Sequence, residues 1–318
     1  MKNLKSGLLG VALGDAIGVP VEFFEQFRLD KNPVKEMMGY GTHHQPVGTW
    51  SDDSSLTFCL AESLLSGFDL NDMASKFIRW QSEAYWAARG EVFDIGITTN
   101  NSINELRVEL STGKNELHLL RYAAKESDNG NGSLMRIFPL LPEFAQTIEE
   151  ERFEKVWNVS ALTHKHIRAA ISCYIYLSFL EILSKEPDKM KAYAELRIQT
   201  NAFFLKNEIS ADEIHHFDRL IKNNICDLER GEVRSGGYVI ETLEASIWSF
   251  LTTDNFSDAV LKAVNLGHDT DTTGAVTGGI AGFYYGMDAL PEFWVVQLAR
   301  MEDIFSLGDR LEAQFNAS

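Results

Sequence analysis

Glycines recur at four-residue intervals in two stretches of the chain, one near each end. They are Gly10, Gly14 and Gly18 in the first stretch, and Gly274, Gly278, Gly282 and Gly286 in the second. Residues four apart lie on one face of an α-helix. A glycine inside a helix costs about 1 kcal/mol relative to alanine, and close approach of another backbone is the simplest gain that offsets this cost. We therefore expect two central helices that pack closely and can pack against each other; the alternative is flexible, irregular backbone.

Apolar residues in the rest of the chain follow the period of amphipathic helices. This period, with a capping residue near most starts, predicts helices over 55–65, 70–80, 167–175, 212–230, 238–251 and 258–266. Alternating runs typical of strands are nearly absent, and no linker or repeat is visible. The sequence predicts an all-α fold with a single domain over residues 1–318, arranged as one compact orthogonal helical bundle.

Composition and charge argue against several classes of partner. The formal net charge is −17, whereas nucleic-acid affinity comes mainly from lysine and arginine side chains that neutralise phosphates. Cys59, Cys173 and Cys226 lack a paired motif, so we expect buried thiols and a reducing, cytoplasmic compartment. Asp15 ends the N-terminal apolar run at about the minimum length of a signal peptide, and no run approaches the ~20 apolar residues of a membrane span. We expect a monomer without a nucleic-acid or membrane partner.

Two short clusters combine carboxylates with hydroxyls just ahead of predicted helices. The first spans Gly48 to Ser55 and the second spans Gly267 to Gly274. Either cluster alone is most often an N-cap. Two close carboxylates repel each other unless a cation or a proton lies between them, and the apolar run that follows the second cluster places its aspartates near the interior. Carboxylates and hydroxyls are hard oxygen donors, which suit Mg²⁺ or Mn²⁺ rather than Zn²⁺.

The second cluster also matches the opening of a calcium-binding EF-hand loop. The twelfth position of such a loop needs a bidentate glutamate, and Ile280 stands there instead, so this alternative fails. Asp269 and Asp271 are two residues apart and would face different sides of a regular helix. They can converge only if the turn before the helix is irregular.

A series of short motifs in a fixed order covers almost the whole chain. They are Gly7 to Ala16 with Glu22 following, Trp50 to Ser54, Phe93 to Gly96, Gly130 to Arg136, Thr163-His164, Gly237 to Ala245, and His268 to Thr272. Each motif is weak alone, but their order makes the signal specific. In these motifs the chain resembles the ADP-ribosylglycohydrolase family.

The resemblance implies an all-α fold with two Mg²⁺ ions at its centre, with Mn²⁺ as an alternative. The implied metal ligands are Ser51, Asp52 and Asp53 in the first set, and Asp269, Asp271 and Thr272 in the second. In the family the metals hold the ribose diol and a water near the anomeric carbon. Asp53 or Glu22 can serve as the base that takes the proton of this water as the oxocarbenium-like transition state forms, and Asp269 is the third candidate catalytic carboxylate.

The resemblance also implies where ADP-ribose binds. The candidate substrate-binding residues are Asn131, Gly132, Ser133, His164, Tyr238 and Asp94. The first three can expose backbone amides to the pyrophosphate, Tyr238 can stack on a base or ribose, and Asp94 can contact the leaving group. Most of these residues have a plainer alternative: an ordinary turn for 130–133, a helix cap or core residue for His164, and core packing for Tyr238. The alternative for the candidate base Glu22 is a surface position.

Four residues depart from the family pattern. Ser51 and Ser54 stand where threonine is usual, which keeps the hydroxyl. The other two affect the wall of the pocket rather than the metals. His268 stands where glycine is common, and Ile97 stands where asparagine is common. The implied activity is Mg²⁺-dependent cleavage of the glycosidic bond between ADP-ribose and an acceptor, which is a protein side chain or a small molecule. The competing interpretations are a two-metal phosphohydrolase of a nucleotide-like substrate and a family member that binds ADP-ribose without turnover.

Overall fold

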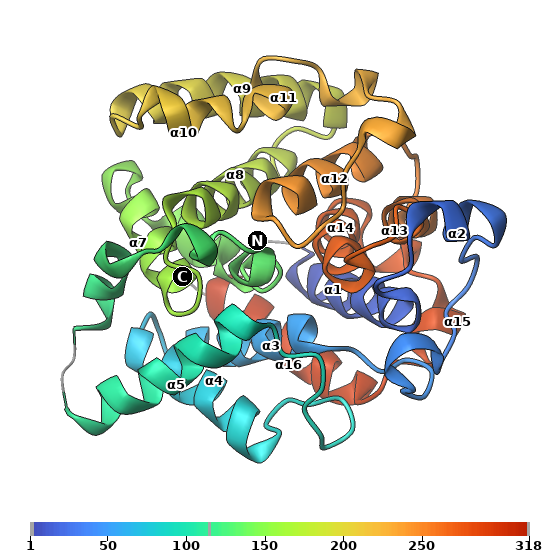
Figure 1. The fold of residues 1–318 in the computed structure, drawn as a ribbon, viewed down its shortest axis with the longest axis horizontal. Helices are drawn as coiled ribbons and strands as arrows, with labels where there is room; N and C mark the ends of the chain where they lie inside the picture. The colour runs from blue at the N-terminus through green and yellow to red at the C-terminus, as the bar shows by residue number, and fades with distance from the viewer. Residues whose placement is uncertain (1–2, 114–115, 317–318) are drawn as a thin grey trace.

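The computed structural model describes residues 3–113 and 116–316, and its regular structure is helical (Figure 1). The α-helices are α1 Leu4–Gly18, α2 Gln26–Lys31, α3 Asp52–Leu64, α4 Leu70–Glu83, α5 Ile97–Ser111, α6 Leu141–Gln146, α7 Glu149–Ala161, α8 Ile167–Leu183, α9 Lys189–Lys206, α10 Ala211–His215, α11 Asp218–Ile221, α12 Val239–Leu251, α13 Phe256–Val264, α14 Thr270–Tyr285, α15 Glu292–Val295 and α16 Met301–Asn316. Within these described ranges no β-strand forms, and only two isolated bridges occur. The all-α prediction is confirmed.

Helices α1 and α14 pack against each other at the centre of the molecule, as the glycine spacing predicted (Figure 1). A Cβ built on Gly10 would lie 2.1 Å from the carbonyl oxygen of Gly278, and one on Gly14 would lie 2.0 Å from that of Gly274. Any side chain at these positions would therefore push the two backbones apart. The pairing is antiparallel, so the C-terminal end of α1 lies beside the N-terminal end of α14. Gly286 lies just past the end of α14 and belongs to the following turn.

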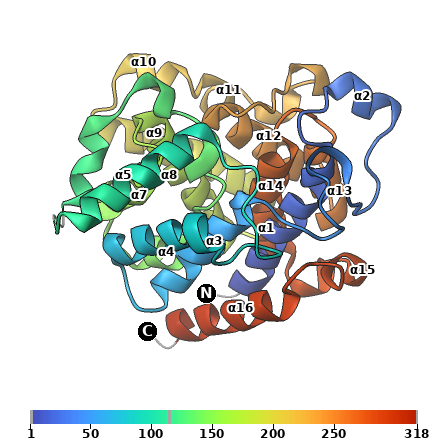
Figure 2. The same ribbon diagram turned by 60° about the horizontal axis from the view of Figure 1, so that its bottom comes forward.

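The other helices surround this pair. Helices α12 and α13 pack on α14, while α3 and α16 pack on α1, and Figure 2 shows α16 running below α1. Helices α9, α10 and α11 lie together at the upper edge of the molecule in Figure 1. The stretch Leu4–Val21 is long and apolar enough to cross a membrane, contrary to the expectation from the sequence, but 94% of it is buried inside the fold. Core packing accounts for its apolar character.

The predicted continuous helix over 212–230 is wrong. The segment forms α10 and α11, followed by two 3-10 turns, Ile225–Asp227 and Arg230–Glu232. The Tyr193 hydroxyl of α9 donates to the Leu220 carbonyl at 2.6 Å and accepts from the Ile225 amide at 3.1 Å. A side chain from another helix thus bonds two backbone groups at the break, which local periodicity cannot reveal.

The sequence predicted three buried thiols, and two of the three are buried. Cys59 and Cys173 are buried, whereas Cys226 is only half-buried because it lies in one of these 3-10 turns.

Candidate functional site

The two acidic clusters meet where α3 and α14 begin. Ser51 caps α3, and its hydroxyl donates to Asp53 Oδ2 at 3.0 Å. The Thr272 hydroxyl, in the first turn of α14, donates to the same oxygen at 3.3 Å. One carboxylate oxygen of Asp53 therefore joins two clusters that lie more than two hundred residues apart in the sequence.

Asp15, in the last turn of α1, fixes the start of α3. Its carboxylate accepts from the Ser51 amide at 2.9 Å, and from the Ser54 amide and hydroxyl at 3.0 and 2.6 Å. The side chain is fully buried, and burial raises its pKa to about 7 although these hydrogen bonds act in the opposite direction. Asp15 was not among the site residues predicted from the sequence, although a single aspartate inside an apolar helix was a usable signal.

The turn before α14 is irregular, as convergence of Asp269 and Asp271 requires. Gly267 and His268 both have positive φ, at 84° and 60°. The His268 amide donates to the Phe24 carbonyl, and the His268 carbonyl accepts from the Phe23 amide, both at 2.7 Å. This backbone pairing holds the segment after Glu22 beside the turn. As a result, carboxylate oxygens of Glu22, Asp269 and Asp271 lie within 4.8 Å of one another.

The carboxylates of this site are destabilised in their charged forms. Burial, followed by repulsion from neighbouring carboxylates, raises the pKa values of Asp52, Asp53 and Asp271 well above their ordinary range. For Glu22, burial and the charges of Asp94 and Asp269 raise the pKa to about 10.

Two buried carboxylate oxygens in the site also lack a partner. Asp53 Oδ1 and Asp271 Oδ2 have no hydrogen-bond donor among residues 3–113 and 116–316. Buried polar atoms normally have a partner, and oxygen donors of this kind suit a hard divalent cation. The residues present therefore fit a metal centre.

A cavity of about 310 Å³ opens beside the acidic clusters. Its lining consists of Glu22, Phe23, Asp52, Asp53, Asp94, Gly96, Ile97, Thr98, Thr99, Gly130, Asn131, Gly132, Met135, His164, Asp269 and Thr272. Among residues 3–113 and 116–316 the lining includes five carboxylates and no lysine or arginine, so the cavity is acidic. Ser51, Ser133, Tyr238 and Asp271 are predicted site residues that do not line it.

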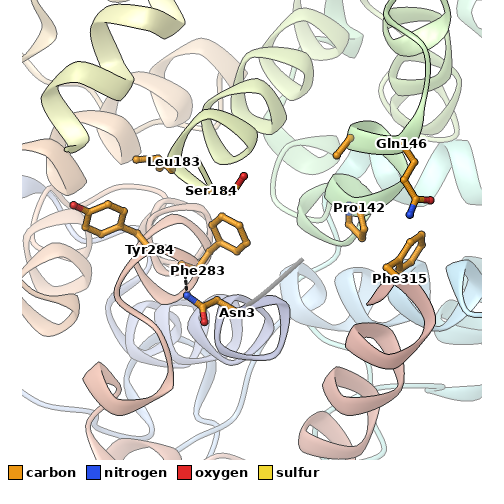
Figure 3. Close-up of a pocket in the computed structure, with 9 residues that line it drawn as sticks. Asn3, Pro142, Gln146, Leu183, Ser184, Phe283, Tyr284 and Phe315 are labelled. Atoms are coloured by element: carbon orange, nitrogen blue, oxygen red, sulfur yellow. Dashed lines mark hydrogen bonds between the residues drawn. The ribbon is translucent and has the colours of Figure 1, made fainter. Parts of the chain in front are cut away.

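A second cavity, of about 510 Å³, lies at the other end of the α1–α14 pair (Figure 3). It is bounded by Asn3 ahead of α1, by Phe283 and Tyr284 of α14, and by side chains of α6, α8 and α16. The side-chain amide of Asn3 donates to the Phe283 carbonyl at 2.9 Å, as the dashed line in Figure 3 shows. In the described part of the chain, its lining contains no carboxylate or imidazole. We therefore assign the chemistry to the smaller, acidic cavity.

Comparison with known proteins identifies the family. The ADP-ribosylglycohydrolase family model matches residues 2–318. The chain belongs to the ADP-ribosylglycohydrolase family. An ADP-ribosylarginine hydrolase Tri1 of Serratia proteamaculans (strain 568) is 33% identical over 98% of this chain and 79% of its own length. Another Tri1, of Pseudomonas putida (strain GB-1), is 31% identical over 98% and 78%. The chain is thus a hydrolase of this family.

Two further relatives extend the comparison. The ADP-ribosyl-[dinitrogen reductase] glycohydrolase of Rhodospirillum rubrum is 26% identical over 91% of this chain and 88% of its own. A solved structure described as an ADP-ribosylglycohydrolase-related protein complex superimposes with a TM-score of 0.76, at 29% identity, and covers 98% of both chains. The likeness therefore includes the whole three-dimensional fold.

Asn131 and Ser133 of this family member have different surroundings. The Asn131 side-chain amide donates to Asp269 Oδ2 at 2.8 Å and to the Thr242 hydroxyl at 2.9 Å, so it orients one of the predicted metal ligands. The Ser133 hydroxyl is fully buried and accepts from the Ser160 hydroxyl at 2.9 Å. The serine side chain thus belongs to the core.

His164 is buried and forms one wall of the cavity. A Cβ on Gly132 would lie 2.5 Å from its Cε1 atom, so this position accepts only glycine without a shift. The Thr163 hydroxyl lies 2.9 Å from its Nδ1 atom. Burial and the charge of Arg136 lower its pKa to about 3, so the imidazole is neutral at physiological pH. The residue that caps α8 is His166, not His164.

Glu22 and Asp94 lie close together at the cavity. Glu22 is buried rather than a surface glutamate. His43, which the sequence did not single out, forms a short hydrogen bond with its carboxylate, and its ring lies 5.4 Å from that of Phe93. Oxygen and nitrogen atoms of Glu22, His43 and Asp94 lie within 4.8 Å of one another. Tyr238 is half-buried next to the start of α12.

Proposed function

We propose that this protein is a Mg²⁺-dependent hydrolase that releases ADP-ribose from modified arginine side chains. The observation that carries the proposal is the convergence of two acidic clusters, with unpartnered buried carboxylate oxygens, on one acidic cavity. The arginine acceptor is supported by the Tri1 relatives, named ADP-ribosylarginine hydrolases. A cavity lined by carboxylates without a lysine or arginine also suits a cationic guanidinium group.

Two Mg²⁺ ions suit the donor set at the starts of α3 and α14. The residues that would hold them are Ser51, Asp52, Asp53, Asp269, Asp271 and Thr272. When bound, such ions supply Lewis acidity, which orients oxygen ligands and makes water a better nucleophile. Asn131 keeps Asp269 in place, and Asp15 keeps the backbone of Ser51 and Ser54 in place.

The protein's own carboxylates would move the proton. Water forms the new bond to the anomeric carbon, and the carbon–nitrogen bond breaks with its electron pair on the guanidine. Asp53 or Glu22 accepts the proton of the water and returns it to the leaving guanidine. Asp94, close to Glu22, faces the guanidinium and favours its departure in the cationic form.

A product assay on matched conjugates tests this proposal. The wild type is incubated with peptides ADP-ribosylated on arginine or on serine, with Mg²⁺ or with a chelator. We expect free ADP-ribose from the arginine conjugate, loss of activity with the chelator and recovery when Mg²⁺ is restored. Release of AMP would instead favour a phosphohydrolase. Tight ADP-ribose binding without turnover, with any divalent metal, would favour a binding protein.

A further inference from the structure

Two large apolar side chains stand exposed at the mouth of the acidic cavity. Phe23 is 65% exposed and Ile97 is 82% exposed, and both line the cavity. The third large apolar residue of the lining, Met135, is buried. Exposed apolar groups beside a binding cavity commonly mark a surface that another molecule covers. We call Phe23 and Ile97 the apolar rim.

The backbone holds Phe23 at this place against its own preference. Its φ is 64°, a left-handed conformation that is unfavourable for a bulky side chain. The hydrogen bond from its amide to the His268 carbonyl fixes this conformation, and its ring lies 6.0 Å from that of His43. Strained residues held by their surroundings cluster at functional sites. The ring is therefore kept at the mouth of the cavity instead of packing in the core.

The rim belongs to one wall of the cavity. Phe23 directly follows Glu22, and Ile97 begins α5 three residues after Asp94. The carboxylates of Glu22 and Asp94 lie together and are the groups we assign to the guanidinium. The residues assigned to the nucleotide, 130–132 and His164, also line the cavity, and none of them is adjacent in sequence to the rim. The rim therefore flanks the acceptor rather than the phosphates.

We propose that the apolar rim contacts the polypeptide around the modified arginine, so that an arginine with apolar neighbours is preferred to a small guanidino conjugate. This inference rests on the proposed arginine specificity. A small conjugate ends at the guanidinium and its short stem, which leaves Phe23 and Ile97 in water. A polypeptide continues past the mouth, and apolar residues beside the arginine would cover both side chains. The cationic arginine also complements the acidic wall next to the rim.

A comparison of three conjugates tests the rim. They are ADP-ribosylated agmatine, a peptide with leucines beside the ADP-ribosylated arginine, and the same peptide with glycines there. The variants are Phe23→Gly, which relieves the strained conformation while it removes the ring, and Ile97→Asn. Leu205→Asn is the matched control, because Leu205 is 81% exposed on α9, away from the cavity. We expect each rim variant to lower kcat/KM for the leucine peptide about tenfold more than for agmatine, a typical effect of losing one well-covered apolar contact.

The outcomes separate this inference from the proposed function. Unchanged selectivity in both rim variants would overturn it. It would also fail if the variants lost activity equally on all conjugates and bound free ADP-ribose more weakly, because the rim would then contact the nucleotide. If the wild type cleaves no conjugate, the proposed function fails. In that case, fluorescence anisotropy of the two peptides measures their binding to the wild type and to the rim variants. Weaker binding of the leucine peptide alone by the rim variants supports the role of the rim, and equally weaker binding of both peptides contradicts it.

Discussion

Asp15 shows how a residue outside the two clusters sets their geometry. It receives three hydrogen bonds from Ser51 and Ser54, so α1 and the start of α3 are joined through one carboxylate. That the two acidic clusters form one site was predictable, because both follow the same hydroxyl–carboxylate pattern ahead of a helix; metal binding by their residues stays a prediction. The partners of Asp15 and His43 were not predictable, because the sequence places them 36 and 21 positions away. Burial of the Ser133 hydroxyl likewise depends on α7.

Asp15→Asn should lower stability by about 1–3 kcal/mol. One of the two carboxylate oxygens becomes an amide nitrogen that faces backbone donors, which leaves buried N–H groups unsatisfied. Urea unfolding of the metal-free protein measures the change. Asp69→Asn is the control, since Asp69 is an exposed N-cap where asparagine is nearly equivalent. Equal effects of the two substitutions would contradict the assigned role of Asp15.

Asp271→Asn should separate stability from metal binding. Its Oδ1 accepts from the Thr272 amide at 2.9 Å, and an asparagine oxygen can replace this acceptor. The substitution also removes one charge from a cluster in which carboxylates repel each other. We expect the metal-free variant to melt no lower than the wild type, while the rise in Tm on adding Mg²⁺ and the hydrolytic activity are both lost. A variant that Mg²⁺ still stabilises like the wild type would contradict the metal assignment.

Among the helices, α1 and α14 decide whether the site exists. Their contact brings the end of α1, with Asp15 and the nearby Glu22, to the start of α14. Sequence periodicity predicted this pair because glycine at every fourth position destabilises a helix unless another backbone packs against that face. Sequence periodicity predicted 212–230 wrongly, because the Tyr193 hydroxyl bonds the backbone where the helix ends after α11. Helix boundaries near the site were also shifted: α3 begins at Asp52, so both aspartates lie in its first turn.

Gly278→Ala should be strongly destabilising. Its Cβ would lie 2.0 Å from the Gly10 carbonyl oxygen, and two backbones cannot rotate out of contact as side chains can. Overpacking a core typically costs about 1–3 kcal/mol, and we expect the upper end or more. Gly231→Ala is the control, because a Cβ there meets no atom within 4 Å. Thermal unfolding and soluble yield provide the comparison. A Gly278→Ala variant as stable as Gly231→Ala would show that the helices do not pack this closely.

For the whole molecule, the buried acid cluster makes stability depend on pH in a direction opposite to the usual one for carboxylates. The ordinary pKa values are 3.8 for Asp15 and 4.5 for Glu22, and the folded metal-free chain raises them to about 7 and about 10. Folding then takes up protons. The free energy of unfolding is therefore highest below the ordinary values and falls as pH rises through the raised ones.

We therefore expect the Tm of the metal-free protein to be lower at about pH 8 than at about pH 5.5, and Mg²⁺ to raise it more at the higher pH. Mg²⁺ binds the ionised carboxylates, so it replaces the protons that are lost. Repulsion between surface charges, from the net charge of −17, also lowers the Tm as pH rises. However, about 0.5 M NaCl screens exposed charges far more than buried ones. The pH dependence should therefore persist in that salt. A Tm that stays level or rises with pH under these conditions would mean that the cluster does not hold its protons in the fold.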